Sequence, residues 1–541
     1  MFKHDLLLPV LFISLFFSFS AVAAPLTVEE KTLDFQQLTG RIKSAYGPLI
    51  YKKESLGVDI DLLQANYLRQ IQESKTNQDF YYLINKFVAE FHDSHFAAML
   101  PTDKRSVLPF FVEYVQGKVF IDEVIPELIA ADKFPFQKGD ELISMNGGLT
   151  EDLLKELMPY VGQGFIKTQK HFAAWMLTSR RSARVPAPEG AVTVVVRPVG
   201  KAETTSHSFN WKVQGEDPAE MASSPSLSYL SQISITQQVA GLIGDGKNIE
   251  RRFMCQGESR IAIPDHATII SKTPFVSYYY PTAKGNVGYV RIPHYHPVGE
   301  AQQAQDVYFS QYEKVIGIME KNTVGLIIDQ DFNCGGYVDL ANRMVGLFMD
   351  KPYHPLYFKM VASKENYLEY QKYVSELNPL TSWYDNVMTV MNLLKDYWQR
   401  GERMTSFTTL NGDTWLQPNL IHYTKPVVML INEMSGSGGD GFPSMMQGYG
   451  RVKLLGTRTM GAGGHVVENP ALNYSQITVS MTRSMFFRPD GVPVENNGAV
   501  PDYPYEITFN DFVGGYVIFY GDSIRSKKHR ACHADCDLRI I

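Results

Sequence analysis

Apolar residues recur along the chain with three different spacings, which divide it into regions of different predicted structure. Residues 80–88 place apolar side chains three and four positions apart, which predicts a helix ending just before residues 92–95. From about 105 to 200 the apolar runs are short and separated by turn residues, as in β-strands. From about 286 to 515, compact apolar runs alternate with helical stretches. The pattern therefore predicts a helical region at 24–104, a β-rich module at 105–200 and an α/β core at 286–515.

Two polar regions interrupt this order. Residues 201–285 show little periodicity and are expected to form an insertion. We interpret it as a regulatory segment that covers a cleft until the chain is processed near Arg251-Arg252. Residues 350–420 are rich in Tyr and Trp and form a second predicted insertion, inside the core. Residues 516–541 form a C-terminal tail.

The first 23 residues differ from the rest of the chain. Residues 6–19 are almost all apolar, and Ala21-Val22-Ala23 is a small-x-small cleavage signal. The run is short for a membrane span, so a cleaved secretory signal is favoured over an uncleaved anchor. No later run approaches about 20 apolar residues. The sequence thus predicts export to a periplasm or to the cell exterior, without stable membrane insertion after cleavage.

Composition and charge narrow the functional classes. The chain has 541 residues with 51 Lys and Arg against 57 Asp and Glu, so no basic surplus points to nucleic acid as a partner. Its 44% of hydrophobic residues is typical of folded domains, of which two to four are expected. Only four Cys occur, and export favours a disulfide between Cys532 and Cys536. A metal site built from that pair with His533 and Asp535 is the alternative.

Candidate chemistry lies beyond the ends of two predicted strands. Apolar runs at 324–329 and 427–432 predict buried strands, and ligands in α/β folds bind outside the carboxyl ends of such strands. The second run leads into residues 433–441, which are rich in Ser and Gly and precede a helix. Ser437 would then stand at a helix N-terminus, where free backbone N–H groups stabilise a developing oxyanion. A glycine-rich turn with a capping serine stays open, whereas a phosphate-binding loop is disfavoured because its Lys is absent.

The first of these runs leads into a second glycine pair. Gly335-Gly336 follows the strand predicted at 324–329 and precedes another helix. Backbone amides in such a turn can supply the other half of an oxyanion hole, and glycine lets the backbone approach a substrate closely. Two such loops at neighbouring strand ends favour a catalytic site over two unrelated turns.

The order of these motifs resembles the C-terminal-processing (tail-specific) serine protease family. The motifs are the signal, the acid-His turn at 92–95, the Lys-Gly-Asp-Glu-Leu-Ile-Ser-Met-Asn-Gly segment at 138–147, and the two glycine loops. The resemblance covers most of residues 85–505. It implies a crotonase-like (ClpP/crotonase-type) α/β catalytic core with an inserted β-rich PDZ-like domain. It also implies that Ser437 is the nucleophile, and that the amides of Gly438, Gly336 and Gly335 form the oxyanion hole.

The general base differs from that of the Lys-based members of this family. Ala462 occupies the position of their Lys, in the glycine-rich loop after the nucleophile. A Ser hydroxyl with an ordinary pKa needs another base. The chain is similar here to the branch that includes the tricorn protease core and the chlamydial protease-like activity factor, whose base is an N-terminal His. Ser94-His95 matches the Ser-His pair of the tricorn type, and a His of near-neutral pKa can accept and return a proton.

The same branch implies the orienting carboxylate. Its Val-Glu-Asn-x-Gly-x-x-Pro-Asp segment corresponds to residues 494–502, which makes Glu495 the acid that orients His95, with Ser94 as a relay. His92 and Asp93 are the near rivals for these roles. His465 is a weaker rival base.

The sequence therefore predicts an exported serine endopeptidase that acts on proteins or peptides by a Ser-His-Glu mechanism. No metal or organic cofactor is implied. The PDZ-like domain could bind a chain terminus or an internal segment by strand addition, and a homodimer stays open as the assembly. Two other classes remain as alternatives: a catalytically inactive binding protein on a protease fold, and a PDZ scaffold whose α/β domain mediates assembly.

Overall fold

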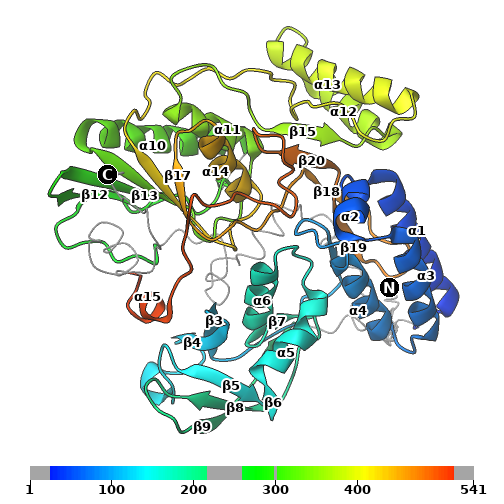
Figure 1. Ribbon diagram of the computed structural model, residues 1–541. Helices are drawn as coiled ribbons and strands as arrows, with labels where there is room; N and C mark the ends of the chain where they lie inside the picture. The colour runs from blue at the N-terminus through cyan, green and yellow to red at the C-terminus, as the bar shows by residue number, and fades with distance from the viewer. Residues whose placement is uncertain (1–24, 216–258, 298–300, 517–541) are drawn as a thin grey trace, which may run out of the picture.

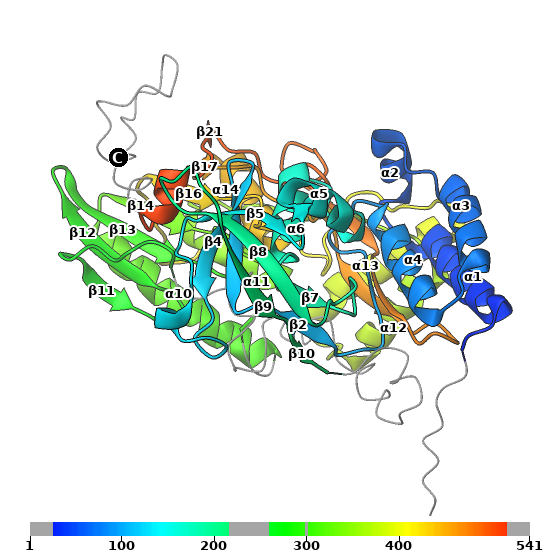
Figure 2. The same cartoon turned by 90° about the horizontal axis from the view of Figure 1, so that it is seen from below.

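The computed structural model describes residues 25–215, 259–297 and 301–516. Figures 1 and 2 show the N-terminal helices at one end, a β-rich module beside them, and a large mixed α/β region that contacts both. Within the described ranges, no helix is long and apolar enough to span a membrane. The predicted signal at residues 1–23 lies outside the described residues.

Four helices form the N-terminal region and carry the predicted acid-His turn at their end. α1 and α4 begin with Thr capping boxes, in which Thr27 pairs with Glu30 and Thr76 pairs with Asp79. The apolar side of α4 is buried against α1 and α3, as its periodicity predicts. The turn at 92–95 follows α4 directly. The elements are α1 (Val28–Ala45), α2 (Leu49–Leu56), α3 (Ile60–Glu73), α4 (Asn77–Ala89) and β1 (Ala97–Met99).

A late segment of the chain completes this helical region. β1 pairs with β19 (Thr478–Thr482), which pairs with β18 (Val466–Asn469) in a three-stranded sheet. Val479 and Met481 of β19 are buried in the same hydrophobic cluster as the helices. In Figure 1 these orange strands lie against the blue helices. The segment that carries β19 therefore packs in the hydrophobic cluster of the helical region, although the sequence pattern assigns it to the α/β core at 286–515.

The β-rich module is built on a six-stranded sheet with the order β3-β4-β5-β8-β9, in which β6 pairs with β5. β9 lies within residues 201–285, so the module extends past the predicted boundary at 200. Five of its six residues are exposed, and a strand of this kind shows no apolar alternation. The elements are β2 (Arg105–Val107), β3 (Phe110–Val115), β4 (Lys118–Val124), β5 (Glu141–Met145), β6 (Gly148–Leu149), α5 (Thr150–Leu157), α6 (Ile166–Trp175), β7 (Ser179–Arg181), β8 (Ala191–Arg197), β9 (Thr205–Asn210) and β10 (Lys212–Gln214).

A seven-stranded sheet forms the centre of the α/β core, with the order β11-β12-β13-β14-β16-β17-β21. Its strands from β13 to β21 are parallel, and β11 and β12 add an antiparallel edge. That edge also lies within residues 201–285, so the region predicted as an insertion contributes strands to both of its neighbours. The strands are β11 (Thr268–Ser271), β12 (Ser277–Thr282), β13 (Gly285–Arg291), β14 (Gly325–Asp329), β16 (Val427–Ile431), β17 (Lys453–Gly456) and β21 (Tyr503–Pro504).

The central parallel pair determines where the two glycine loops lie. β14 and β16 are neighbours, paired from Leu326↔Val427 to Asp329↔Leu430, so their carboxyl ends meet at one edge of the sheet. Both strands are almost wholly buried, as their apolar runs predict. The mixed α/β character of the core is thus confirmed. Its helices are α10 (Ala301–Asn322), α11 (Val338–Val345), α14 (Gly438–Gly448) and α15 (Phe509–Val513).

The second predicted insertion, residues 350–420, lies outside the central sheet. It contributes a helical hairpin, packed around Val374, Val387 and Met391, and one strand that pairs with β20. Figure 1 shows the hairpin above the core. Its elements are β15 (Tyr357–Met360), α12 (Lys364–Glu376) and α13 (Ser382–Gln399), and β20 is Ser484–Phe487.

The packing of β19 in the cluster of the helical region predicts that this strand stabilises that region. Met481 is 1% exposed in the cluster with the helices, so Met481→Ala should lower the free energy of unfolding by roughly 2–5 kcal/mol. Leu62→Ala on α3, where the side chain is 72% exposed, is the control and should change it by less than about 0.5 kcal/mol. Urea denaturation measures both. Equal effects of the two substitutions would contradict this packing of β19.

Candidate active site

Ser437 stands on a strained turn between β16 and α14. Its backbone has φ 59° and ψ −116°, a conformation that costs a non-glycine residue about 1–3 kcal/mol. Gly436 and Gly438 flank it, and α14 begins at Gly438. The strand–turn–helix context predicted for Ser437 is therefore present, with the serine at the N-terminus of the helix.

The loop after β14 lies directly against this turn. A Cβ atom added to Gly335 would lie 2.5 Å from the Ser437 Cβ and 2.6 Å from the Gly438 nitrogen, so only glycine fits there. Cross-loop hydrogen bonds hold the two segments together: the Gly436 N–H donates to the Asn333 carbonyl at 2.8 Å, and the Phe332 N–H donates to Asn432 Oδ1 at 2.9 Å. The two predicted glycine loops are thus brought together.

The three amides predicted for the oxyanion hole are not equivalent. The Gly335 N–H donates to Asn333 Oδ1 at 2.8 Å, so it is already occupied. Within the described residues, the N–H groups of Gly336 and Gly438 have no hydrogen-bond partner. The absence of a side chain at Gly335 therefore allows the two loops to approach closely. The amides of Gly336 and Gly438 are the donors available to an oxyanion.

The Asp440 carboxylate organises the turn from inside. This fully buried group accepts hydrogen bonds from the N–H groups of Ser437 at 2.8 Å, Gly461 at 2.9 Å and Ala462 at 2.9 Å, and from the Thr459 hydroxyl. Burial raises the pKa of Asp440 to about 6, and its four donors oppose that shift. Sequence reasoning missed this residue, although a Ser followed by Asp three positions later is a capping-box signal.

The acid-His turn forms a second cluster. Asp93, predicted as a rival for a catalytic role, is fully buried and accepts from the Tyr46 hydroxyl at 2.8 Å, the Thr482 hydroxyl at 2.9 Å and the His95 N–H at 2.8 Å. It fixes the backbone of the turn between α4 and β19. Ser94 Oγ and His95 Nδ1 are buried and have no hydrogen-bond partner in the described ranges. Burial lowers the pKa of His95, and the Asp93 carboxylate opposes that shift.

Glu495 lies near this cluster, but the partners of its carboxylate lie outside the acid-His turn. Its carboxylate pairs with Lys52 of α2 and accepts from the Gly463 N–H at 2.9 Å. Lys52 is as fully buried as Glu495, and it also donates to the His92 carbonyl at 2.8 Å and to Asn496 Oδ1 at 2.5 Å. Burial, together with Asp93, raises the pKa of Glu495 to about 8, and Lys52 opposes the shift. The predicted contact of Glu495 with Ser94 or His95 is not formed among the described residues.

The glycine-rich loop after β17 joins the two clusters. Its Gly461 and Ala462 amides bind Asp440, and its Gly463 amide binds Glu495. Burial lowers the pKa of His465 to about 4, with further lowering by Arg483 and by His95. Within the described residues, no hydrogen bond joins the Ser437 hydroxyl to His95. The structure thus places Ser437 with the glycine loops in one cluster. It places His95 with Asp93 and the Glu495 segment in the other, and the glycine-rich loop after β17 contacts both.

Lys52 is the second residue that sequence reasoning missed, because nothing around it in the chain distinguishes it from a surface lysine. Cys334, next to Gly335, is disulfide-bonded. The predicted Cys532–Cys536 pair lies outside the described residues.

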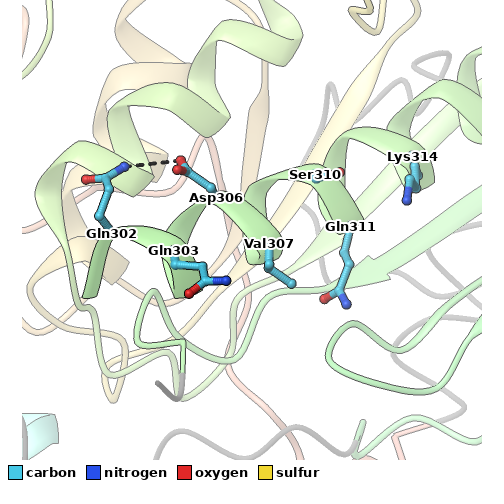
Figure 3. A pocket seen from close by; sticks show the side chains of 7 residues that line it. All are labelled: Gln302, Gln303, Asp306, Val307, Ser310, Gln311 and Lys314. Carbon is cyan, nitrogen blue, oxygen red and sulfur yellow. Dashed lines mark hydrogen bonds between the residues drawn. The ribbon is translucent and has the colours of Figure 1, made fainter. Parts of the chain in front are cut away.

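An open hollow elsewhere has no link to this chemistry. It follows one face of α10, and Figure 3 shows its lining side chains, none of which is a predicted site residue. They are Gln302, Gln303, Asp306, Val307, Ser310, Gln311 and Lys314. In the ranges that the structure covers, no group of three or more His, Cys, Asp or Glu side chains is arranged to hold a metal ion.

Two parts of the chain match the models of known families. Residues 286–505 match the model of peptidase family S41, and residues 104–221 match that of the PDZ domain. The resemblance predicted from the sequence is thereby confirmed.

Two relatives and one solved structure are similar to the chain over different shares of its length. A Chlamydia pneumoniae protein is 24% identical over 575 residues, covering 94% of this chain and 91% of its own. The tricorn protease of Thermoplasma acidophilum is 32% identical over 89 residues, which is 16% of this chain and 8% of that protein. The crystal structure of mature CPAF superimposes with a TM-score of 0.78 at 20% identity, covering 92% of this chain and 96% of that one. This likeness defines the fold of nearly the whole chain.

The four donors on Asp440 predict the effect of changing it. Asp440→Asn replaces one carboxylate oxygen by an amide group, whose N–H donors would face backbone N–H donors. The free energy of unfolding should fall by about 1–3 kcal/mol for each donor left unsatisfied. Asp306→Asn on α10, where the carboxylate is 53% exposed, is the control and should change it by less than about 0.5 kcal/mol. Thermal unfolding measures both, and an unchanged Asp440→Asn protein would contradict the assignment.

Proposed function

We propose that the protein is an exported serine endopeptidase. The observation that carries the proposal is the Ser437 turn, which places a hydroxyl at a helix N-terminus beside two backbone amides with no other partner within the described residues. Preorganised donors of this kind stabilise an oxyanion as it forms. The S41 match over residues 286–505 supports peptide bonds as the substrate class.

In the proposed reaction, the Ser437 oxygen attacks the scissile carbonyl and His95 accepts the serine proton. The amides of Gly438 and Gly336 hold the tetrahedral oxyanion. His95 then returns the proton to the leaving amine, and water hydrolyses the acyl-enzyme by the reverse proton path. Burial supports the base role, because it lowers the pKa of His95 and keeps the imidazole neutral at pH 7.

The carboxylate role is assigned to Glu495, with Ser94 as the relay. The buried Ser94 hydroxyl and His95 Nδ1 both lack partners among the described residues, so both are available for a connecting hydrogen bond. Each Glu495 oxygen has a second lone-pair direction beyond its bond to Lys52 or Gly463. Asp93 supports His95 electrostatically from the backbone side of the turn. A His-based mechanism is favoured over a Lys-based one, because Ala462 replaces the loop lysine and Lys52 is bound to Glu495.

The remaining features extend the proposal. We propose that the core has the crotonase-like arrangement that the family implies, and that the signal at residues 1–23 directs export. Protein or peptide substrates are the proposed partners. The edge strand β3 of the PDZ domain could add an extended peptide as a further strand.

Removing the nucleophile tests the enzyme against the two alternatives. A fluorophosphonate probe should label the folded protein, and Ser437→Ala should abolish both labelling and casein cleavage. Ser444→Ala, a buried serine in the same helix, should keep the label. An unlabelled wild-type protein would defeat the proposal and favour an inactive binding or scaffold protein. We expect Ser437→Ala to keep its partner binding whether the wild type is an enzyme or a scaffold protein.

The pH dependence tests the base and its carboxylate. Activity should fall partly as pH drops through about 8, because protonated Glu495 no longer supports the imidazolium. The remaining activity should be lost with a midpoint below 6.5, because burial lowers the pKa of His95, and once protonated it cannot accept the serine proton. Profiles of kcat/KM for the wild type and for Glu495→Gln should differ only in the first step. A final loss centred above 6.5 in Glu495→Gln would contradict His95 as the base.

A further inference from the structure

Four charged groups of alternating sign, two of them buried and two partly buried, connect the PDZ domain to the core. Arg260 pairs with Glu113 at 3.2 Å, Glu113 also pairs with His171, and His171 Nδ1 lies 3.3 Å from Glu433 Oε1. The side chains of Glu113 and His171 are each 4% exposed, and that of Glu433 is 16% exposed. None of these residues belongs to the proposed reaction.

The groups come from different parts of the fold. Glu113 lies on β3 and His171 on α6, both in the PDZ domain, whereas Arg260 precedes β11 of the core sheet. Glu433 lies four residues before Ser437, in the loop that carries the nucleophile. The backbone of Glu433 is fixed on both sides, since its carbonyl accepts from the Thr168 hydroxyl of α6 at 2.7 Å and its N–H donates to Thr457 Oγ1 at 3.0 Å.

Aromatic side chains pack around His171 and Arg260 of this chain of charges. The ring of His171 lies 4.9 Å from that of Trp175 and 5.7 Å from that of Phe332, and the Arg260 guanidinium lies 3.8 Å from the Phe332 ring centroid. Trp175, Phe332 and Met434 form a buried cluster. Phe332 is three residues before Gly335, and Met434 is three residues before Ser437. Both loops of the proposed site therefore rest on helix α6.

The charges are stable at neutral pH because each has an opposite neighbour. Glu113 raises the pKa of His171 to about 9 against the effect of burial, with a smaller contribution from Glu433. His171 and Arg260 lower the pKa of Glu113 to about 2, also against burial. Removing one member leaves a buried charge without compensation, which is strongly unfavourable.

Other titratable groups lie near this chain of charges. The Tyr516 hydroxyl accepts from Arg260 Nη1 at 2.9 Å, Asp122 interacts electrostatically with Arg260, and the Tyr114 ring lies 6.4 Å from that of His171. Burial raises the pKa of Tyr516 above its usual value and that of Asp331 to about 8.

We infer that protonated His171 is a positioning residue of the proposed serine site: through Glu433 it holds the nucleophile loop in register, so that the PDZ domain is a fixed support of that site. The inference rests on the proposed function for its effect on the reaction. The positioning itself is a property of the fold.

The sign of the pH effect follows from the raised pKa. The imidazolium is present below about pH 9 and is lost as pH rises through that value, so the bridge to Glu433 weakens on the alkaline side. Wild-type kcat should therefore fall with a midpoint near 9, while KM stays within about threefold, because positioning affects the transition state more than substrate binding.

Three variants test this. Glu433→Gln removes one of the two carboxylates that hold the proton on His171, and should move the alkaline midpoint down by about one pH unit. His171→Gln should lower kcat at least about tenfold at pH 7 and abolish the alkaline step. His207→Gln, an exposed histidine on β9 of the same domain, is the matched control and should behave as the wild type. Casein cleavage and fluorophosphonate labelling of Ser437 are followed from pH 7 to 10.5.

Hydrogen exchange separates this inference from the proposed function. Peptides covering residues 330–340 and 432–445 should exchange faster in His171→Gln and Glu433→Gln than in the wild type or His207→Gln. Faster exchange supports the positioning role even if the wild type proves to lack proteolysis, which would defeat only the proposed function. An active wild type whose alkaline midpoint is unchanged by Glu433→Gln, or whose exchange is unchanged in both variants, would overturn the inference.

Discussion

The close approach of Gly335 to Ser437 is the contact on which the proposed site depends. Parallel pairing of β14 with β16 brings the two loops to the same sheet edge, and the absence of a side chain at Gly335 lets them touch. Cross-loop hydrogen bonds through Asn333 and Asn432 then hold Ser437 in a backbone conformation that few serines adopt. The surrounding structure stabilises this strain, because any relaxation of the turn would break several buried hydrogen bonds.

Buried carboxylates hold the segments around the Ser437 turn in place. Asp440 binds the nucleophile turn and the glycine-rich loop, Asp93 binds the acid-His turn to β19, and Glu495 binds Lys52 of the helical region. Each carboxylate joins segments that lie far apart in the sequence, and each is fully buried. Such groups are tolerated only when hydrogen-bonded or paired, so they allow few alternative arrangements of the segments that they join.

Three regions of the chain therefore act as one unit around Ser437. The helical region supplies His95 and shares a hydrophobic core with β19, while the PDZ domain supports both glycine loops through α6, Trp175 and His171. Strand β3 therefore has two features: it is an edge strand that pairs with β4 alone among the described strands, and it carries the buried Glu113 of the charge chain.

The sequence by itself determined the local elements and most of the chemical candidates. Compact apolar runs marked β14 and β16, helical spacing marked α4, and glycine placement marked the Ser437 and Gly335 loops, because these features depend on burial and backbone conformation within a few residues. Only the tertiary structure decided which distant groups meet. The pairing of Lys52 with Glu495, the entry of β19 into the helical region and the bridge from His171 to Glu433 join positions hundreds of residues apart, and β9 has no apolar alternation to reveal it. The local sequence pattern indicates whether a side chain is buried. Which residue it contacts depends on how the whole chain packs.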